Sequence, residues 1–153
     1  MLKPGDAAPN AKYLTVEEGI SNAADHKGRK LALYFYPKDD TTGCTREAQD
    51  FSALAGDFDS VGVDIVGISR DSVKSHAKFI GKYDLKVALG SDEGGEVCEA
   101  FGVWVEKSLY GRRYMGIERA TFLIDRDGKI ARIWRKVKVA GHASEVLEAA
   151  RAL

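Results

Sequence analysis

A cysteine at the start of a predicted helix is the residue best suited to chemistry in this chain. Cys44 follows an apolar run that ends at Tyr36 and a short polar segment that begins with Pro37. A thiol in the first turn of a helix meets N–H groups without helical partners and the positive end of the helix dipole. Both favour the thiolate, the nucleophilic form. On position alone, an inert buried thiol is an equally good interpretation.

The residues around Cys44 carry groups that would assist a thiolate. Pro37 stiffens the loop and shields one side of the thiol. Thr41 has a hydroxyl that can accept from a free helix N–H or donate to a thiolate or a bound oxygen. Glu47, one helical turn beyond the cysteine, is placed to orient a cation.

The remaining thiol and imidazole groups form no motif. Cys98 is far from Cys44 in sequence and the chain has no CxxC, which excludes a thioredoxin-type dithiol. His26, His76 and His142 are too scattered to make a zinc-ligand pattern. We predict that the three histidines occupy surface or helix-face positions, and we expect no metal or cofactor.

Length and charge narrow the class of protein. The 153 residues suffice for a single domain with a real core, and we expect one domain over 1–153. The 23 basic and 23 acidic residues balance, so nothing favours nucleic acid or an anionic membrane as a partner. The longest apolar run, 31–36, is too short to span a bilayer. With no signal-peptide h-region at the start, we expect a cytoplasmic protein.

Buried strands alternate with helices in the first two thirds of the chain. The first thirty residues favour a short strand or hairpin, 31–36 and 63–69 favour strands covered on both faces, and a short strand is expected at 87–89. A helix starts at about Cys44, another is capped by Asp71 or Ser72, and a third begins at 91–93. Their predicted buried faces are, respectively, Ala48, Phe51, Ala55 and Phe58; Val73, His76, Ala77 and Ile80; and Val97, Cys98 and Phe101.

The last third favours antiparallel strands and a final helix. Residues 120–125 and 130–137 favour two strands joined by an Asp127-Gly128 turn. The final helix would bury Ala143, Val146, Leu147 and Ala150. The sequence therefore predicts a thioredoxin-like α/β fold, a central mixed β-sheet flanked by helices with an N-terminal hairpin. Sites in such sheets form where strands end and helices begin, and Cys44 is predicted to lie at such a point.

Several motifs of the chain resemble those of a known family. Pro37-x-x-x-Thr41-x-x-Cys44 matches the PxxxTxxC signature of peroxiredoxins, and the run 34–48 is similar to the bacterioferritin comigratory protein, or PrxQ, subfamily. Segments 89–92, 101–107 and 114–128 agree with the same subfamily, in the same order. The resemblance thus covers nearly the whole chain.

The resemblance implies a role for each matching residue. Cys44 would be the peroxidatic cysteine, attacking one peroxide oxygen and becoming a sulfenic acid. Thr41 would hydrogen-bond the thiolate and the peroxide, and Pro37 would shield the thiolate. The charge of Arg119 would favour the thiolate and stabilise the transition state. Glu47 would orient Arg119.

Two positions depart from the family pattern. Gln49 stands where many members carry a resolving cysteine, and Thr42 stands where a proline is common. Cys98 then remains the one candidate resolving thiol. A disulfide would need Cα atoms within about 7 Å and the unwinding of a helix. We therefore expect the sulfenic acid to be reduced by an external thiol such as thioredoxin, glutaredoxin or a small thiol, with a Cys44–Cys98 disulfide as the alternative.

The resemblance implies a thiol peroxidase acting on hydrogen peroxide and alkyl hydroperoxides, often a monomer. A peroxide-sensing regulatory module with the same thiolate is the alternative, while a non-catalytic scaffold fits poorly with the joint presence of the four motif residues. The aromatic side chains of Trp104 and Tyr110 suit either the core or the border of a substrate pocket. Lys107, Arg112 and Arg113 favour a solvated loop, with the docking of a reductase as the alternative role.

Overall fold

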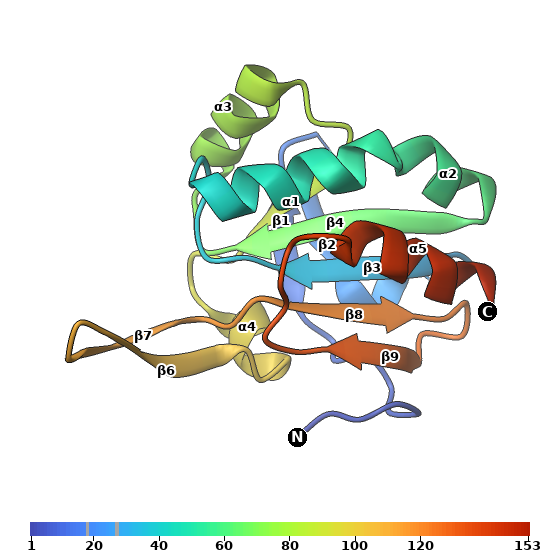
Figure 1. The fold of residues 1–153 in the computed structure, drawn as a ribbon. Helices are drawn as coiled ribbons and strands as arrows, with labels where there is room; N and C mark the ends of the chain where they lie inside the picture. Colours follow the sequence, from blue (N-terminus) through green and yellow to red (C-terminus); the bar gives the residue numbers. More distant parts are fainter. Residues whose placement is uncertain (18, 27) are drawn as a thin grey trace.

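A seven-stranded sheet forms the centre of the molecule, in the order β2-β1-β5-β4-β3-β8-β9, and β6 and β7 form a separate two-stranded hairpin (Figure 1). The computed structural model describes residues 1–17, 19–26 and 28–153. The strands are β1 (Lys12–Thr15), β2 (Gly19–Asn22), β3 (Lys30–Phe35), β4 (Val63–Ser69), β5 (Ala88–Ser91), β6 (Trp104–Leu109), β7 (Arg112–Ile117), β8 (Ala120–Ile124) and β9 (Ile130–Trp134).

Strand directions make the sheet mixed, as the sequence predicts. The central strands β3, β4 and β5 run parallel, whereas β8 pairs antiparallel with β3 and β9 pairs antiparallel with β8. The N-terminal hairpin of β1 and β2 is present and extends the sheet, because β1 pairs antiparallel with β5. The helical connections between parallel strands follow from that direction, since a tight turn cannot join two parallel strands.

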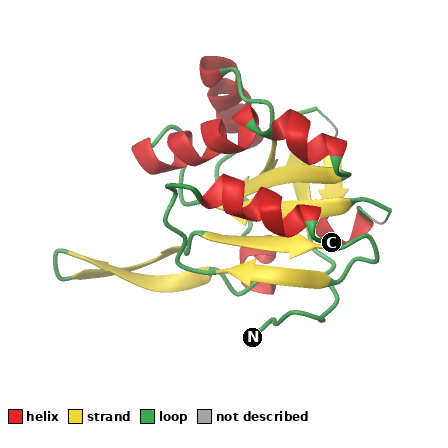
Figure 2. Ribbon diagram, turned by 45° about the vertical axis from the view of Figure 1, so that its right-hand side comes forward, coloured by secondary structure: helices red, strands yellow, loops and turns green. Residues whose placement is uncertain are grey.

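Helices cover both faces of this sheet, as Figure 2 shows. One apolar cluster joins one face of the sheet to α1, α2, α3 and α5, and a second joins the other face to α4 and the N-terminal segment. The helices are the 3₁₀ helix η1 (Ala23–Asp25), α1 (Thr42–Ala53), α2 (Ala55–Ser60), α3 (Val73–Tyr83), α4 (Glu96–Ala100) and α5 (His142–Arg151).

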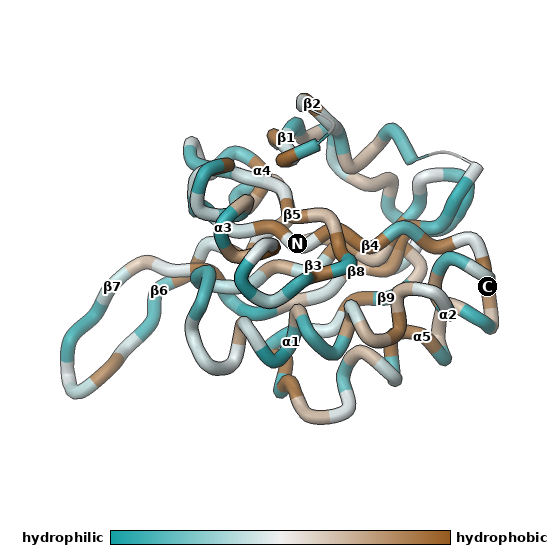
Figure 3. The backbone as a smooth tube through the Cα atoms, turned by 90° about the horizontal axis from the view of Figure 1, so that it is seen from above, coloured by the Kyte–Doolittle hydropathy of each residue, from teal (hydrophilic) through white to brown (hydrophobic). Residues whose placement is uncertain are grey.

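Strand β3 lies at the centre of the core and is buried along its whole length. Its side chains alternate between the two faces, with Leu33 and Phe35 in one cluster and Ala32 and Tyr34 in the other. Figure 3 shows the hydrophobic colour gathered along the central strands and the hydrophilic colour on much of the outer helices and loops. A continuously apolar strand is therefore what this position requires.

Several predicted boundaries needed correction. The helix expected to run from Cys44 past Phe58 is broken at Leu54 into α1 and α2. The last strand ends at Trp134 rather than at residue 137, and α4 begins at Glu96, after 91–93. The earlier residue Asp92 still caps α4, because its carboxylate accepts the N–H groups of Val97 and Cys98.

The hairpin of β6 and β7 was missed. Lys107, Arg112 and Arg113 belong to it rather than to a solvated loop, and Tyr110 lies exposed in its turn. Strands of this hairpin are largely exposed, so they lack the apolar alternation that marks a half-buried strand. Figure 1 shows the hairpin projecting away from the main sheet.

The predicted helix faces were mostly right. The buried faces of α4 and α5 contain the residues expected for them, whereas on α3 Ala77 is exposed and Phe79 is buried. His76 and His142 lie on helices, as predicted, and both are buried. Within the described part of the chain, no helix is long and apolar enough to cross a membrane.

Tyr34 connects the sheet to α1 and leaves no room for a side chain at Gly67. Its ring stacks on Phe51 of α1, with centroids 4.6 Å apart, and a Cβ at Gly67 would lie 2.5 Å from Tyr34 Cζ.

We predict that Gly67→Ala lowers the free energy of unfolding by about 1–3 kcal/mol through overpacking. Gly81→Ala on α3 is the control, because no atom lies near its added Cβ, and it should raise stability by up to about 1 kcal/mol. Urea denaturation measures both. Equal stability of Gly67→Ala and the wild type would contradict the packing described.

Candidate active site

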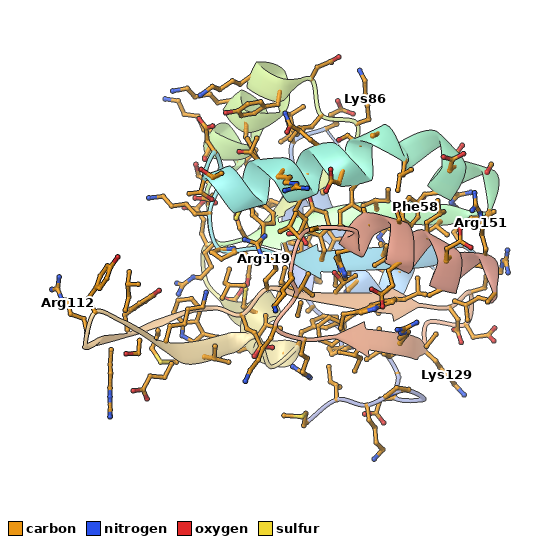
Figure 4. All side chains as sticks on the ribbon, in the orientation of Figure 1. Phe58, Lys86, Arg112, Arg119, Lys129 and Arg151 are labelled. Carbon is orange, nitrogen blue, oxygen red and sulfur yellow. The ribbon has the colours of Figure 1, made fainter. Side chains whose placement is uncertain are left out.

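The guanidinium of Arg119 joins Cys44 and Glu47. Arg119 Nη2 donates to Cys44 Sγ at 3.3 Å, and Nη1 donates to Glu47 Oε1 at 2.6 Å. The thiol is 2% exposed, while the Arg119 side chain is 17% exposed and reaches the surface. Figure 4 shows the labelled Arg119 below α1, on the side from which the loop enters that helix. The structure thus brings together three residues that the sequence analysis singled out separately.

Sheet register places Arg119 beside the cysteine. Ala120, the first residue of β8, pairs with Phe35, the last residue of β3. Arg119 precedes β8 and therefore lies at the end of the sheet where β3 finishes and the loop to α1 begins. Cys44 and Glu47 are three residues apart on α1, so both side chains lie on one face of the helix. The antiparallel pairing of β8 with β3 brings Arg119 next to Cys44, although the two residues are 75 positions apart in sequence.

The helix start supplies further positive potential. Thr41 is the N-cap of α1, and the first helical hydrogen bond runs from the Thr45 N–H to Thr41 O at 2.8 Å. The three preceding N–H groups, including that of Cys44, have no partner within the helix. Cys44 Sγ is therefore set between the positive end of α1 and a guanidinium.

Glu47 has a buried carboxyl group, 1% exposed, that faces the cation of Arg119. Burial raises its pKa to about 7, although the neighbouring Arg119 acts in the opposite direction. Its second oxygen, Oε2, has no hydrogen-bond partner within the described residues. For Arg119, burial lowers the pKa, but Glu47 and Cys44 outweigh that effect and the pKa is raised.

Thr41 and Pro37 flank the site differently. The Thr41 hydroxyl does not cap the helix and donates its single proton to Lys38 O at 2.8 Å. Its oxygen keeps acceptor capacity but has no second proton for the thiol. Pro37 is exposed and forms part of a groove of about 530 Å³ between the loop and the hairpin. Lys38, Arg70, Glu93, Trp104, Lys107, Tyr114, Met115, Gly116 and Ile117 line the rest of it.

Lys107 is a residue near the site that the sequence analysis assigned to a loop. Burial first, and then the charge of Arg119, lower the pKa of Lys107, while Cys44 acts in the opposite direction. Its ammonium group is therefore within electrostatic range of both. A lysine in a mostly exposed hairpin gives no signal in sequence, because only the fold turns β6 toward the cysteine.

Cys98 lies on the other side of the sheet from Cys44. Cys44 packs in the cluster that contains Tyr34, whereas Cys98 packs with Leu33 and Phe35. Adjacent side chains of β3 point to opposite faces, so the sheet separates the two thiols. Cys98 is 0% exposed, and burial together with Asp92 raises the pKa of its thiol far above the ordinary range. Both properties are those of an inert core thiol.

Comparisons with known proteins identify the family. Residues 4–133 match the AhpC/TSA family. The chain belongs to the AhpC/TSA family. A Coxiella burnetii protein named putative peroxiredoxin bcp is 48% identical over 146 residues, which cover 95% of this chain and 97% of that protein.

Solved structures of similar proteins agree. Xanthomonas campestris peroxiredoxin Q superposes with a TM-score of 0.90 at 45% identity, covering 99% of this chain and 96% of that one. A structure described as addressing the alkyl peroxide reduction activity of the X. campestris bacterioferritin comigratory protein gives 0.90 at 44% identity, covering 99% and 97%. This AhpC/TSA member thus has the thioredoxin-like fold that the sequence predicts, and it is a peroxiredoxin of the Bcp/PrxQ type, a thiol-dependent peroxidase.

The buried carboxyl group of Glu47 has a measurable effect on stability. Its pKa in the folded protein is about 7, above the ordinary value of 4.5, so the contribution of Glu47 to stability is greatest below pH 4.5 and is lost as the pH rises through 7. The loss should reach about 3 kcal/mol at pH 7. We predict that Glu47→Gln removes this loss.

Urea denaturation at pH 4.5 and 7 tests that prediction. Between pH 4.5 and 7, the wild type should lose about 3 kcal/mol of unfolding free energy that Glu47→Gln does not lose. Glu99→Gln, which changes an exposed glutamate, should keep the wild-type dependence. The same pH dependence in all three proteins would show that Glu47 does not titrate in this way.

Proposed function

We propose that Cys44 is the residue at which this peroxiredoxin reduces hydroperoxides. The observation that carries the proposal is the 3.3 Å hydrogen bond from Arg119 Nη2 to Cys44 Sγ at the start of α1. The thiolate sulfur attacks one oxygen of the peroxide, an S–O bond forms and the O–O bond breaks. The leaving oxygen takes up a proton and departs as water or an alcohol, and Cys44 is left as a sulfenic acid.

The surrounding residues assist at different points of this step. Arg119 stabilises the thiolate and the negative charge that develops on the two peroxide oxygens as their bond lengthens. Glu47 fixes the direction of the guanidinium through its 2.6 Å contact. The Thr41 hydroxyl turns from Lys38 O to a bound peroxide or the thiolate, and Pro37 shields the sulfur from bulk water.

We propose hydrogen peroxide and alkyl hydroperoxides as the substrates. The X. campestris relative is described as having alkyl peroxide reduction activity, and this chain is 44% identical to it. The groove beside Pro37 is lined by apolar residues, including Trp104 and Ile117, as well as by charged ones, and has about 530 Å³ of space for an alkyl group. Hydrogen peroxide needs none of that space.

An external thiol completes the cycle in this proposal. Gln49 removes the local resolving thiol, and the sheet lies between Cys44 and Cys98. A thiol of thioredoxin, glutaredoxin or a small molecule attacks the sulfenic sulfur, forms a mixed disulfide and releases water. A second thiol then displaces Cys44 and restores its thiolate. We further propose that the chain acts as a single domain over 1–153, as a monomer, in the cytoplasm.

Intact-mass spectrometry after one equivalent of hydrogen peroxide tests the one-cysteine cycle. We predict a gain of one oxygen, or its trapped thiol adduct, on the Cys44 peptide. The Cys98→Ser variant should give the same product at the same rate. A rapid loss of two hydrogens with a Cys44–Cys98 crosslinked peptide, absent from Cys98→Ser, would instead establish the two-cysteine mechanism.

Turnover with a thiol donor separates an enzyme from a sensor. The wild type should consume many equivalents of peroxide, whereas a sensor stops after one. Cys44→Ser should have no peroxidase activity, and activity retained in this variant would refute the assignment of Cys44.

A further inference from the structure

The fully buried imidazole of His76 has a polar partner at each ring nitrogen. His76 Nδ1 lies 2.7 Å from Asp39 Oδ2, and Nε2 lies 3.1 Å from the carbonyl oxygen of Gly90. A carbonyl oxygen only accepts, so Nε2 must be a donor. The short contact with Asp39 needs a second proton. Burial raises the pKa of Asp39, but hydrogen bonds from His76, Tyr36 and Ser75 outweigh it and lower the pKa overall, which favours Asp39 as the acceptor in this contact.

Every side of the Asp39 carboxylate is occupied by a donor. Oδ1 accepts from Tyr36 Oη at 2.6 Å, and Oδ2 accepts from Ser75 Oγ at 2.7 Å as well as from His76. Asp71 completes the group by accepting the backbone N–H of Asp39 at 2.9 Å. Asp39, Asp71 and His76 come close enough to hold a cation. Their facing atoms are already engaged in hydrogen bonds, so the arrangement is that of a fixed polar network rather than an open metal site.

This network holds the loop that leads to the thiol. Asp39 lies between Pro37 and Thr41, in the segment that joins β3 to α1. Its neighbour Asp40 has a left-handed backbone, with φ of 58°, and its carboxylate accepts from Lys82 Nζ at 2.7 Å and from Tyr83. Two consecutive aspartates therefore attach the loop to α3, one to the first half of that helix through a buried hydrogen bond and one to its far end on the surface.

The attachment fixes where α1 begins. Two residues separate Asp39 from Thr42, the first residue of α1, and Cys44 lies in the first turn. A loop free to shift would carry the first turn of α1 with it and lengthen the 3.3 Å contact between Cys44 and Arg119. Arg119 immediately precedes β8, a separate element, so a shift of the loop and the first turn of α1 would not carry its backbone along.

We propose that Asp39 and His76 are positioning residues for peroxide reduction, and that the buried hydrogen bond between them holds the β3–α1 loop so that Cys44 stays against Arg119. This inference rests on the proposed role of Cys44. Neither side chain touches the thiol, so their action is exerted through the loop.

Two substitutions at His76 separate the bond to Asp39 from the filling of space. The amide nitrogen of asparagine matches the position of Nδ1, whereas that of glutamine matches Nε2. His76→Asn therefore keeps a donor for Asp39, and His76→Gln keeps the donor for Gly90 O and loses the one for Asp39. We expect His76→Gln to lower the second-order rate constant of Cys44 oxidation by hydrogen peroxide at least tenfold. His76→Asn should stay within threefold of the wild type.

A second histidine–aspartate pair provides the matched control. His26 Nδ1 lies 3.0 Å from Asp64 Oδ2, before the start of β3 and at the end of the strand opposite the loop. His26→Gln should leave the rate unchanged. Rates are compared at a temperature at which circular dichroism shows each variant to be folded. Equal rates in His76→Asn and His76→Gln, or rates that follow thermal stability instead of the Asp39 bond, would overturn the proposal.

Two further measurements apply even if the His76 variants do not fold. Ser75→Ala removes one of the donors to Asp39 and should lower the rate about threefold or more, while an unchanged rate would contradict the proposal. In the wild type, ¹⁵N NMR of the His76 ring should show Nδ1 protonated and hydrogen-bonded to Asp39, and a bare Nδ1 would exclude that bond. Peroxidase activity retained by Cys44→Ser, in contrast, would refute the proposed function and not the network.

Discussion

One guanidinium serves two acidic side chains at this site, and the rest of the structure keeps all three together. Arg119 donates to Cys44 Sγ and to Glu47 Oε1, although the carboxyl group is buried deeply enough for its pKa to rise to about 7. Because burial raises the pKa of Glu47, its carboxyl group competes less for the positive charge than an exposed carboxylate would. A guanidinium suits this position because its fixed fork can engage two partners at once and stays charged at any physiological pH.

The fold meets this constraint from two directions. Antiparallel pairing of β8 with β3 sets Arg119 at the edge of the sheet, and the helix that follows β3 presents Cys44 and Glu47 on one face. Tyr34 and Phe51 stack between sheet and helix, and the Asp39–His76 pair ties the intervening loop to α3. Each contact comes from a different element, so the geometry of the site depends on the tertiary structure as a whole.

Local signals in the sequence predict most of the fold but little of the site's geometry. A run of apolar residues gives β3, and the PxxxTxxC signature gives the start of α1, because both depend on neighbouring residues. Arg119 carries no local signal and comes only from the resemblance to the family. The pairing of Asp39 with His76, the approach of Lys107 and the separation of Cys98 from Cys44 depend on how distant segments meet. The exposed hairpin of β6 and β7 lacks the apolar alternation on which strand assignment rests.

The most direct test is the rate at which Cys44 reacts with two different reagents when Arg119 is replaced. Stopped-flow kinetics at pH 7 would compare hydrogen peroxide with iodoacetamide in the wild type, Arg119→Lys and Arg119→Met. If the guanidinium stabilises charge on the breaking O–O bond, Arg119→Met should lose at least about 100-fold with peroxide, close to 2.7 kcal/mol. It should lose much less with iodoacetamide, and Arg119→Lys should be intermediate with peroxide. Equal losses with the two reagents, or no loss with peroxide, would contradict the central role of Arg119.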